Sequence, residues 1–179
     1  LVENKGIIIS EGGQIFLTAR GKDTLTQTVV NNTGVLQANS ITSQNGVISL
    51  LGAGGDVVHN GTINVSGLGR DAKGGIVSIG GDRVALIANS TIRAKGDQGG
   101  GGGTVVVGAD TAGKLASVSG TFANSDNAYL RTANTVLTQS ASVIDVSASN
   151  GSAAGGFVET SGAGGKIAGL VNGSAGAQW

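Results

Sequence analysis

Cysteine, proline and methionine are all absent from this sequence of 179 residues, and histidine occurs once, at His59. Without cysteine the chain can form neither a disulfide framework nor a thiolate metal site. A chain that is exported unfolded through a narrow pore is also best made without disulfides. Because methionine is missing even at position 1, we expect the chain to be a piece of a longer polypeptide.

Clustered charge is missing too, since 11 basic and 11 acidic residues are spread along the chain and the formal net charge is zero. Nucleic-acid footprints and electrostatic membrane anchors both need grouped lysine and arginine, so the sequence argues against either partner. No apolar run approaches the roughly 18 residues of a membrane-spanning helix, and no signal peptide is visible. We therefore expect no membrane insertion.

Glycine and aliphatic residues dominate what is present. Glycine accounts for 34 of the 179 residues, without a collagen-like triplet period, and hydrophobic residues make up 39%. This hydrophobic content is too high for a disordered chain, and the glycines suit tight turns. Residues 74–96, GGIVSIGGDRVALIANSTIRAKG, are typical of three short strands separated by turn residues.

Two families of short segments repeat parts of this unit along the chain. The first family follows glycine, usually paired, and reads GGQIFLTA, NGVISLLG, GGIVSIGG, GGTVVVGA and GGFVETSG. The second family reads GIIIS, GVLQAN, GTINVS, STIRAK and SVIDVS. Both share a period of about 28 residues and the same doubled gap before the last member. A common period in two independent families predicts a repeat architecture.

Aliphatic residues recur at fixed places within each family, and mixed or polar residues stand beside them. The aliphatic columns are Ile15, Ile48, Val77, Val105 and Val158; Leu17, Leu50, Ile79 and Val107, followed by Thr160; and Ile8, Leu36, Ile63, Ile92 and Ile144. The mixed columns are Phe16, Ser49, Ser78, Val106 and Glu159; and Ile9, Gln37, Asn64, Arg93 and Asp145. Because side chains alternate across a strand, the aliphatic columns predict the interior, and the outer face is expected to carry Ser78, Arg83 and Arg93.

A third, weaker strand adds Val30, Val57 and Leu86 as one more column. Three strands in each coil of about 28 residues predict an all-β fold, a single-chain parallel β-helix that extends over residues 1–179. Coils then stack about 4.8 Å apart, and a continuous aliphatic interior is the main source of stability.

Asparagine recurs just before the second strand of each coil, at Asn4, Asn32, Asn60 and Asn89. Amides stacked in successive coils could form a hydrogen-bonded ladder. Asparagines in solvated turns are an equal alternative on the sequence alone.

The repeat pattern fails between Gly108 and Ser140. Residues 111–140 are either a diverged coil or an excursion from the body of the β-helix. They include Phe122 and the single tyrosine, Tyr129, for which we expect a packing role rather than a functional one.

Candidate catalytic residues are few. Some parallel β-helices cleave acidic polysaccharides with clustered charged residues, and Asp56, His59, Asp71, Asp82 and Arg83 are the residues here that could form such a cluster. They fall on different strands or corners and share no column. His59 lies in the turn-like sequence VHNG and is expected to be a solvated turn histidine rather than a catalytic base.

Cofactor and metal motifs are absent as well. Residues Gly99–Gly103 are expected to form a flexible corner, because no Lys-Ser/Thr pair follows them and no helix begins there as in a phosphate-binding loop. The sequence KGDQGGGGG lacks the alternation of calcium-binding glycine repeats. We therefore predict no catalytic, cofactor-binding or metal-binding residues, no cofactor and no enzymatic activity.

Several segments follow one another in an order that resembles filamentous haemagglutinin-type exoproteins of bacterial two-partner secretion, the group that includes the high-molecular-weight adhesins. These segments are NNTGVLQANSITSQNGVISLLG, VVHNGTINVSG, GGIVSIGGDRVALIANSTIRAKGDQGGGGGTVVVGAD and GGFVETSG. The resemblance implies a right-handed β-helix, export through an outer-membrane β-barrel transporter, and a role at the bacterial cell surface. The family's secretion domain carries an Asn-Pro-Asn-Gly-type motif. A chain without proline lacks this motif, which implies a place just downstream of that domain.

The sequence therefore predicts a structural role, as a β-helical shaft segment of a large secreted or surface-exposed adhesin. A second hypothesis is a binding module that contacts a host or matrix glycan or protein through its outer face or residues 111–140. A polysaccharide lyase or hydrolase is a third. Open strand edges at the end coils also favour end-to-end self-association.

Overall fold

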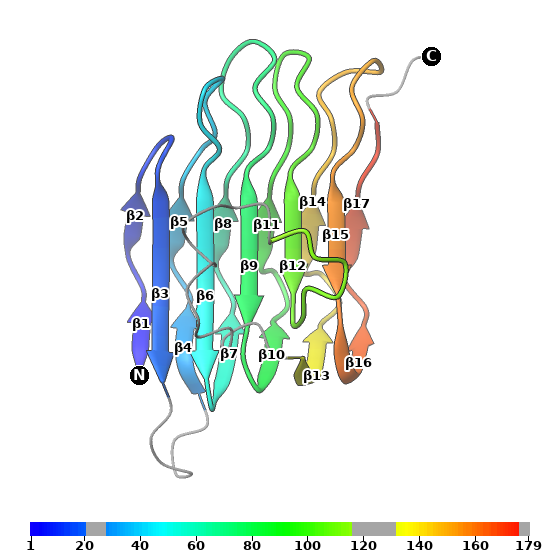
Figure 1. Cartoon of the computed structure of the whole chain (residues 1–179). Coiled ribbons are helices and arrows are strands. Elements are labelled where there is room, and N and C mark those ends of the chain that lie inside the picture. The colour runs from blue at the N-terminus through cyan, green and yellow to red at the C-terminus, as the bar shows by residue number, and fades with distance from the viewer. Residues whose placement is uncertain (21–27, 116–131, 176–179) are drawn as a thin grey trace.

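The chain folds as a right-handed parallel β-helix of about five turns, with about 29 residues in each turn (Figure 1). The computed structural model describes residues 1–20, 28–115 and 132–175. Within these ranges every regular element is a strand, and each of the first five coils contributes one strand to each of three parallel sheets, while the last coil adds β16 and β17 to two of them. The predicted fold, its three strands per coil and its period are confirmed.

Each sheet forms one face of the β-helix, and strands from successive coils follow one another along it (Figure 1). The first face consists of β1 (Val2–Asn4), β4 (Thr28–Asn32), β7 (Asp56–His59), β10 (Arg83–Leu86), β13 (Ala133–Thr138) and β16 (Gly162–Ile167). The second face consists of β2 (Ile7–Ile9), β5 (Val35–Gln37), β8 (Thr62–Asn64), β11 (Thr91–Arg93), β14 (Val143–Asp145) and β17 (Leu170–Asn172). The third face consists of β3 (Gln14–Arg20), β6 (Val47–Ala53), β9 (Ile76–Gly80), β12 (Thr104–Val107) and β15 (Phe157–Thr160).

The aliphatic columns of the sequence form the interior. On the second face, Ile92 pairs in register with Ile63 of the preceding coil and Ile144 of the following coil, and all three are at most 2% exposed. On the third face, Val77 pairs with Ile48 and Val105 in the same way. Strict register matters because a slip by one residue would turn every inward side chain outward.

The corners depend on short polar and glycine residues. Where the second face ends, Asn64 and Asp145 each accept a hydrogen bond from the backbone N–H two residues later, at 3.1 and 3.0 Å, which closes a local turn. The glycine corner at Gly99–Gly103 is closely packed rather than flexible as expected. A Cβ on Gly102 would lie 1.8 Å from the carbonyl oxygen of Val146, so only glycine fits there.

The third predicted column was wrong in one coil. Val30 and Val57 do align, but Val84 and not Leu86 continues their column, while Leu86 pairs with His59. The corner after β10 spans residues 87–90, two residues more than residues 60–61 after β7. The predicted column was obtained by counting a fixed number of residues backward from the second-face strand. The longer corner therefore placed Leu86 where Val84 stands. It still faces the interior and is 1% exposed.

The segment without a clear repeat divides into parts with different places in the fold. Residues 133–138 form β13, which pairs with β10 and β16 within the first face. Residues 109–115 leave the coil after β12 and lie across the outer side of β12 and β15 (Figure 1). Phe122 and Tyr129 lie outside the described residues.

Adjacent residues of β11 test the assignment of inside and outside. The substitution Ile92→Ala removes a fully buried side chain from the central column and should lower the free energy of unfolding by about 2–5 kcal/mol. The substitution Arg93→Ala alters an exposed position and should change it by less than about 0.5 kcal/mol. Urea unfolding followed by circular dichroism measures both, and equal effects would contradict the assignment.

Candidate functional site

Asp56 and Arg83 form the clearest charged pair on the outer surface. They stand at the start of β7 and β10 on the first face, in adjacent coils. The guanidinium donates two hydrogen bonds, from Nε to Oδ1 at 2.8 Å and from Nη2 to Oδ2 at 2.6 Å. These bonds and the charge of Asp56 raise the pKa of Arg83. A bidentate pair of this kind positions two strands and leaves no carboxyl group poised to transfer a proton.

The five candidate residues do not assemble into one cluster. Asp71 has a positive φ of 56° and lies in an exposed turn, and Asp82 occupies the turn before β10. His59 faces the interior, on the opposite side of the first face from Asp56 and Arg83. Among residues 1–20, 28–115 and 132–175, no three His, Asp or Glu side chains gather where they could hold a metal ion. In the same ranges, no helix is long and apolar enough to cross a membrane.

The prediction that His59 is a solvated turn residue was wrong. It is the last residue of β7, its side chain points inward, and it is fully buried. Burial lowers the pKa of His59 to about 4, against weaker effects in the opposite direction from hydrogen bonds with Thr91 and Asn32. The ring is therefore neutral at physiological pH. The turn begins one residue later, at the exposed Asn60.

His59 completes an amide ladder that the sequence predicted only in part. The side chain of Asn4 donates to Oδ1 of Asn32 at 2.7 Å, and Nδ2 of Asn32 lies 3.1 Å from Nδ1 of His59. Asn60 and Asn89 take no part, because both lie in exposed turns. The ladder hypothesis is thus correct for the first two coils, and histidine replaces asparagine in the third.

The outer side of the third face is covered at β6, β9 and β12, which the sequence did not predict. The column of Ser49, Ser78 and Val106 does point outward, but each of these residues is at most 1% exposed. Leu115, in the segment that leaves the coil after β12, is also fully buried. Within the described part of the chain, the hydroxyl groups of Ser49 and Ser78 have no hydrogen-bond partner. Ser78 is therefore outward-facing but not solvated.

Glu159 fastens the covering segment to the third face. Its carboxylate accepts hydrogen bonds from the backbone N–H groups of Thr111 and Ala112, at 2.8 and 3.2 Å, and from the hydroxyl groups of Thr111 and Ser161. Partial burial raises the pKa of Glu159, but these hydrogen bonds outweigh that effect and lower it overall. Nearby, the Lys114 ammonium lies 5.3 Å from the centre of the Phe157 ring.

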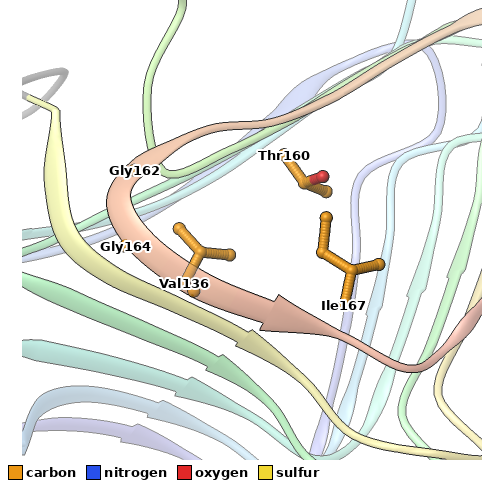
Figure 2. Close-up of a pocket in the computed structure, with 6 residues that line it drawn as sticks. Val136, Thr160, Gly162, Gly164 and Ile167 are labelled. Atoms are coloured by element: carbon orange, nitrogen blue, oxygen red, sulfur yellow. The ribbon is translucent and has the colours of Figure 1, made fainter.

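A hollow of about 300 Å³ lies in the last coil, where Val136, Thr160 and Ile167 point toward one another inside the curve of β16 (Figure 2). It exists because Gly165 occupies the place that Val136 holds in the preceding coil, so the inward column loses its side chain. This hollow is the open end of the interior and carries no reactive group.

A smaller hollow, of about 200 Å³, lies on the outer surface of the first face. We call it the first-face depression; its floor is the outward column of Val58, Ala85 and Leu137. Ala85 is shorter than its neighbours, which creates the depression, and the Asp56–Arg83 pair borders it. An apolar floor beside a charged pair could contact a partner.

Comparison with known proteins gives one informative likeness. The chain matches no protein-family model and no curated protein sequence. It does resemble a solved structure, the crystal structure of the HMW1 secretion domain from Haemophilus influenzae, with 24% sequence identity and a TM-score of 0.67. The alignment covers 98% of this chain and 49% of the solved chain, so this chain spans about half the length of that domain. The likeness shows a shared fold.

The hydrogen bonds of Glu159 give a testable energy. The substitution Glu159→Gln replaces one accepting oxygen by a donor that faces other donors, and should lower the free energy of unfolding at pH 7 by about 1–3 kcal/mol. The matched substitution Glu11→Gln, at an exposed position, should change it little. Chemical unfolding of both variants and the parent chain at pH 7 measures the difference.

The same comparison at low pH checks the role of the charge. Since the pKa of Glu159 is lowered in the folded state, its stabilising effect is present above the unfolded value of 4.5 and is lost as the pH falls through the folded value. The difference in the free energy of unfolding between the Glu159→Gln variant and the parent chain should therefore be smaller at pH 3 than at pH 7. A difference that stays constant with pH would contradict this assignment.

Proposed function

We propose that the chain is a β-helical shaft segment of a large secreted or surface-exposed bacterial adhesin that is exported by two-partner secretion. The observation that carries this proposal is the likeness of nearly the whole chain to the structure of the HMW1 secretion domain. The ordered segments from NNTGVLQAN to GGFVETSG, which resemble the same class of exoproteins, support it independently.

The physical design of the coils suits export followed by folding outside the cell. A chain without cysteine or proline has neither disulfides nor slow prolyl isomerisation to delay folding after it leaves a pore. Each folded coil presents three strand edges that template the next coil. An outer-membrane β-barrel transporter of the two-partner type is the export partner under this proposal.

The end coils support a role in building length. Inward aliphatic side chains that are buried in the inner coils are exposed there, with Ile8 of β2 38% exposed and Val171 of β17 44% exposed. Unpaired parallel edges with apolar side chains are surfaces on which another coil can stack. The same edges would also permit end-to-end self-association. A place just downstream of the secretion domain, as the missing Asn-Pro-Asn-Gly-type motif implies, stays part of this proposal.

We also propose that the segment is not an enzyme. The reason is geometric: the bidentate Asp56–Arg83 pair lies outside the first face, while His59 is buried on its inner side. A catalytic acid and a catalytic base must both reach the reacting atoms of one substrate. Here the sheet separates His59 from Asp56 and Arg83. Assays for reducing ends or unsaturated products on acidic polysaccharides should therefore remain silent.

The first-face depression favours a second candidate function, a binding module for a host or matrix glycan or protein. Its apolar floor of Val58, Ala85 and Leu137 and its charged border are the features such a partner would contact. A glycan array with the isolated chain distinguishes the candidates. Specific binding that the substitution Ala85→Trp abolishes would favour the binding module, and silence at high protein concentration would leave the structural role.

Two neighbouring aspartate substitutions test the shaft proposal. Ile63→Asp places a charge in the interior of β8, whereas Asn64→Asp places the same residue on the outer side of the same strand. The chain is fused behind a signal peptide and a two-partner secretion domain and produced with the cognate transporter. We expect Ile63→Asp to reduce the protein released outside the cell at least several-fold and Asn64→Asp to leave it unchanged.

Folding and export can be separated in the same experiment. Protease resistance of the released protein reports folding, and its amount reports export. Equal release of both variants would contradict a link between coil folding and export. Release of the parent chain in the absence of the transporter would contradict the two-partner route.

A further inference from the structure

The amide ladder is a directional chain of hydrogen bonds inside the first three coils. It begins at the backbone N–H of Gly6, which donates to Oδ1 of Asn4 at 3.2 Å. Asn4 then donates to Asn32, and Asn32 donates to Nδ1 of His59. It ends where Nε2 of His59 lies 3.3 Å from the carbonyl oxygen of Thr91.

The two backbone groups at its ends fix the direction of this ladder. The carbonyl oxygen of Thr91 can only accept, so Nε2 of His59 must carry the proton and Nδ1 must be the bare acceptor. That requirement turns the donor end of the Asn32 amide toward His59 and its oxygen toward Asn4. Asn4 is oriented in turn, with its oxygen toward the Gly6 N–H. Every donor meets an acceptor in this one polarity.

A proton on His59 cannot be accommodated without losing a hydrogen bond. Once both ring nitrogens are donors, Asn32 must reverse its amide to offer oxygen to Nδ1. Its donor end then faces the donor end of Asn4, and reversing Asn4 as well places its donor end against the N–H of Gly6. One donor therefore always faces another donor, in an interior that excludes water.

No acidic side chain lies close enough to His59, among the described residues, to stabilise a charged ring. The neighbours of His59 in its column are Asn32 and Leu86, and the adjoining columns are aliphatic. In the described ranges, the other buried ionisable side chain is Glu159, which lies on the outer side of the third face. Asp56 and Arg83 lie on the outer side of the first face and neutralise each other.

The ladder is confined to one part of the β-helix. Its column continues beyond His59 as Leu86 and then Thr138, so the later coils hold no histidine at this place. In a β-helix, each coil contacts only its neighbours, and a defect in one coil opens that part of the structure first. A strained ladder would therefore act on the coils that contain it.

We propose that the Asn4–Asn32–His59 ladder is an acid-sensitive lock, which holds the first three coils closed at neutral pH and releases them in mild acid. The later coils stay folded under the same conditions. This device concerns the stability of the coils and does not depend on the proposed route of export.

The pH window follows from the direction of the change in pKa. The pKa of His59 falls from 6.5 to about 4 on folding, so the unfolded state binds the proton more readily. The stability that the first three coils gain from a neutral His59 is fully present above about pH 6.5 and declines as the pH falls toward 4. By linkage, opening of the first three coils should become about 30-fold more favourable between pH 7.5 and pH 5.

Hydrogen exchange at two matched amides tests the proposal on the intact chain. Val35 in β5 and Val143 in β14 occupy the same place on the second face, and their N–H groups donate to the carbonyl oxygens of Gly6 and Ser90, at 2.8 and 2.9 Å. Protection factors corrected for intrinsic exchange should fall about 30-fold at Val35 between pH 7.5 and pH 5, and remain nearly constant at Val143. No change at Val35, or an equal fall at both amides, would overturn the proposal.

The substitution His59→Asn supplies the control, because asparagine continues the amide ladder without a titratable group. This variant should keep its protection at Val35 at pH 5, and the same fall as in the parent chain would overturn the proposal. Should the variant fail to fold, nitrogen NMR of the single histidine decides the question. The expected result is a neutral ring protonated at Nε2 down to about pH 5, and an Nδ1-protonated or charged ring at pH 6 would overturn the proposal.

Discussion

The register between successive coils is the constraint on which the rest of this structure depends. Parallel hydrogen bonding places each residue directly against its counterpart in the next coil, so Ile63, Ile92 and Ile144 share one interior column. Because alternate side chains face opposite sides, the same register decides what is buried, what is exposed and which polar groups can reach one another. The aliphatic interior, the amide ladder and the Asp56–Arg83 pair are all consequences of it.

The repeats made most of the fold predictable, and the exceptions have physical causes. Columns of aliphatic residues on the second and third faces could be read directly, because each coil repeats the same alternation. Leu86 was misplaced because a longer corner changes the count without changing the strand pattern. His59 resembled a turn residue because its hydrogen-bond partner, Asn32, comes from the preceding coil, 27 residues away. Such partners become visible only when the register is known.

The outer side of the third face was unpredictable for another reason. Residues 109–115, which follow no repeat, lie as a cover across β12 and β15, and a pattern of alternation says nothing about a segment that leaves the coil. Glu159 belongs to the repeated segment GGFVETSG and stands in an outward column, yet it holds that cover through hydrogen bonds with Thr111 and Ala112. The β-helix thus has features beyond the stacked strands at the places where the sequence departs from the repeat. The coils between these places consist of strands that stack in register.

The central claim, a parallel stack in this particular register, can be tested directly because the natural sequence contains no cysteine. Thr62 and Thr91 are register partners on the outer side of adjacent coils, whereas Thr62 and Val143 are two coils apart. The pair Thr62→Cys with Thr91→Cys should therefore form a disulfide under a mild oxidant. The pair Thr62→Cys with Val143→Cys should not, since about 9.6 Å between the backbones is too far to bridge. Mass spectrometry after thiol alkylation reads both results, and efficient cross-linking of the second pair, or none in the first, would contradict the account.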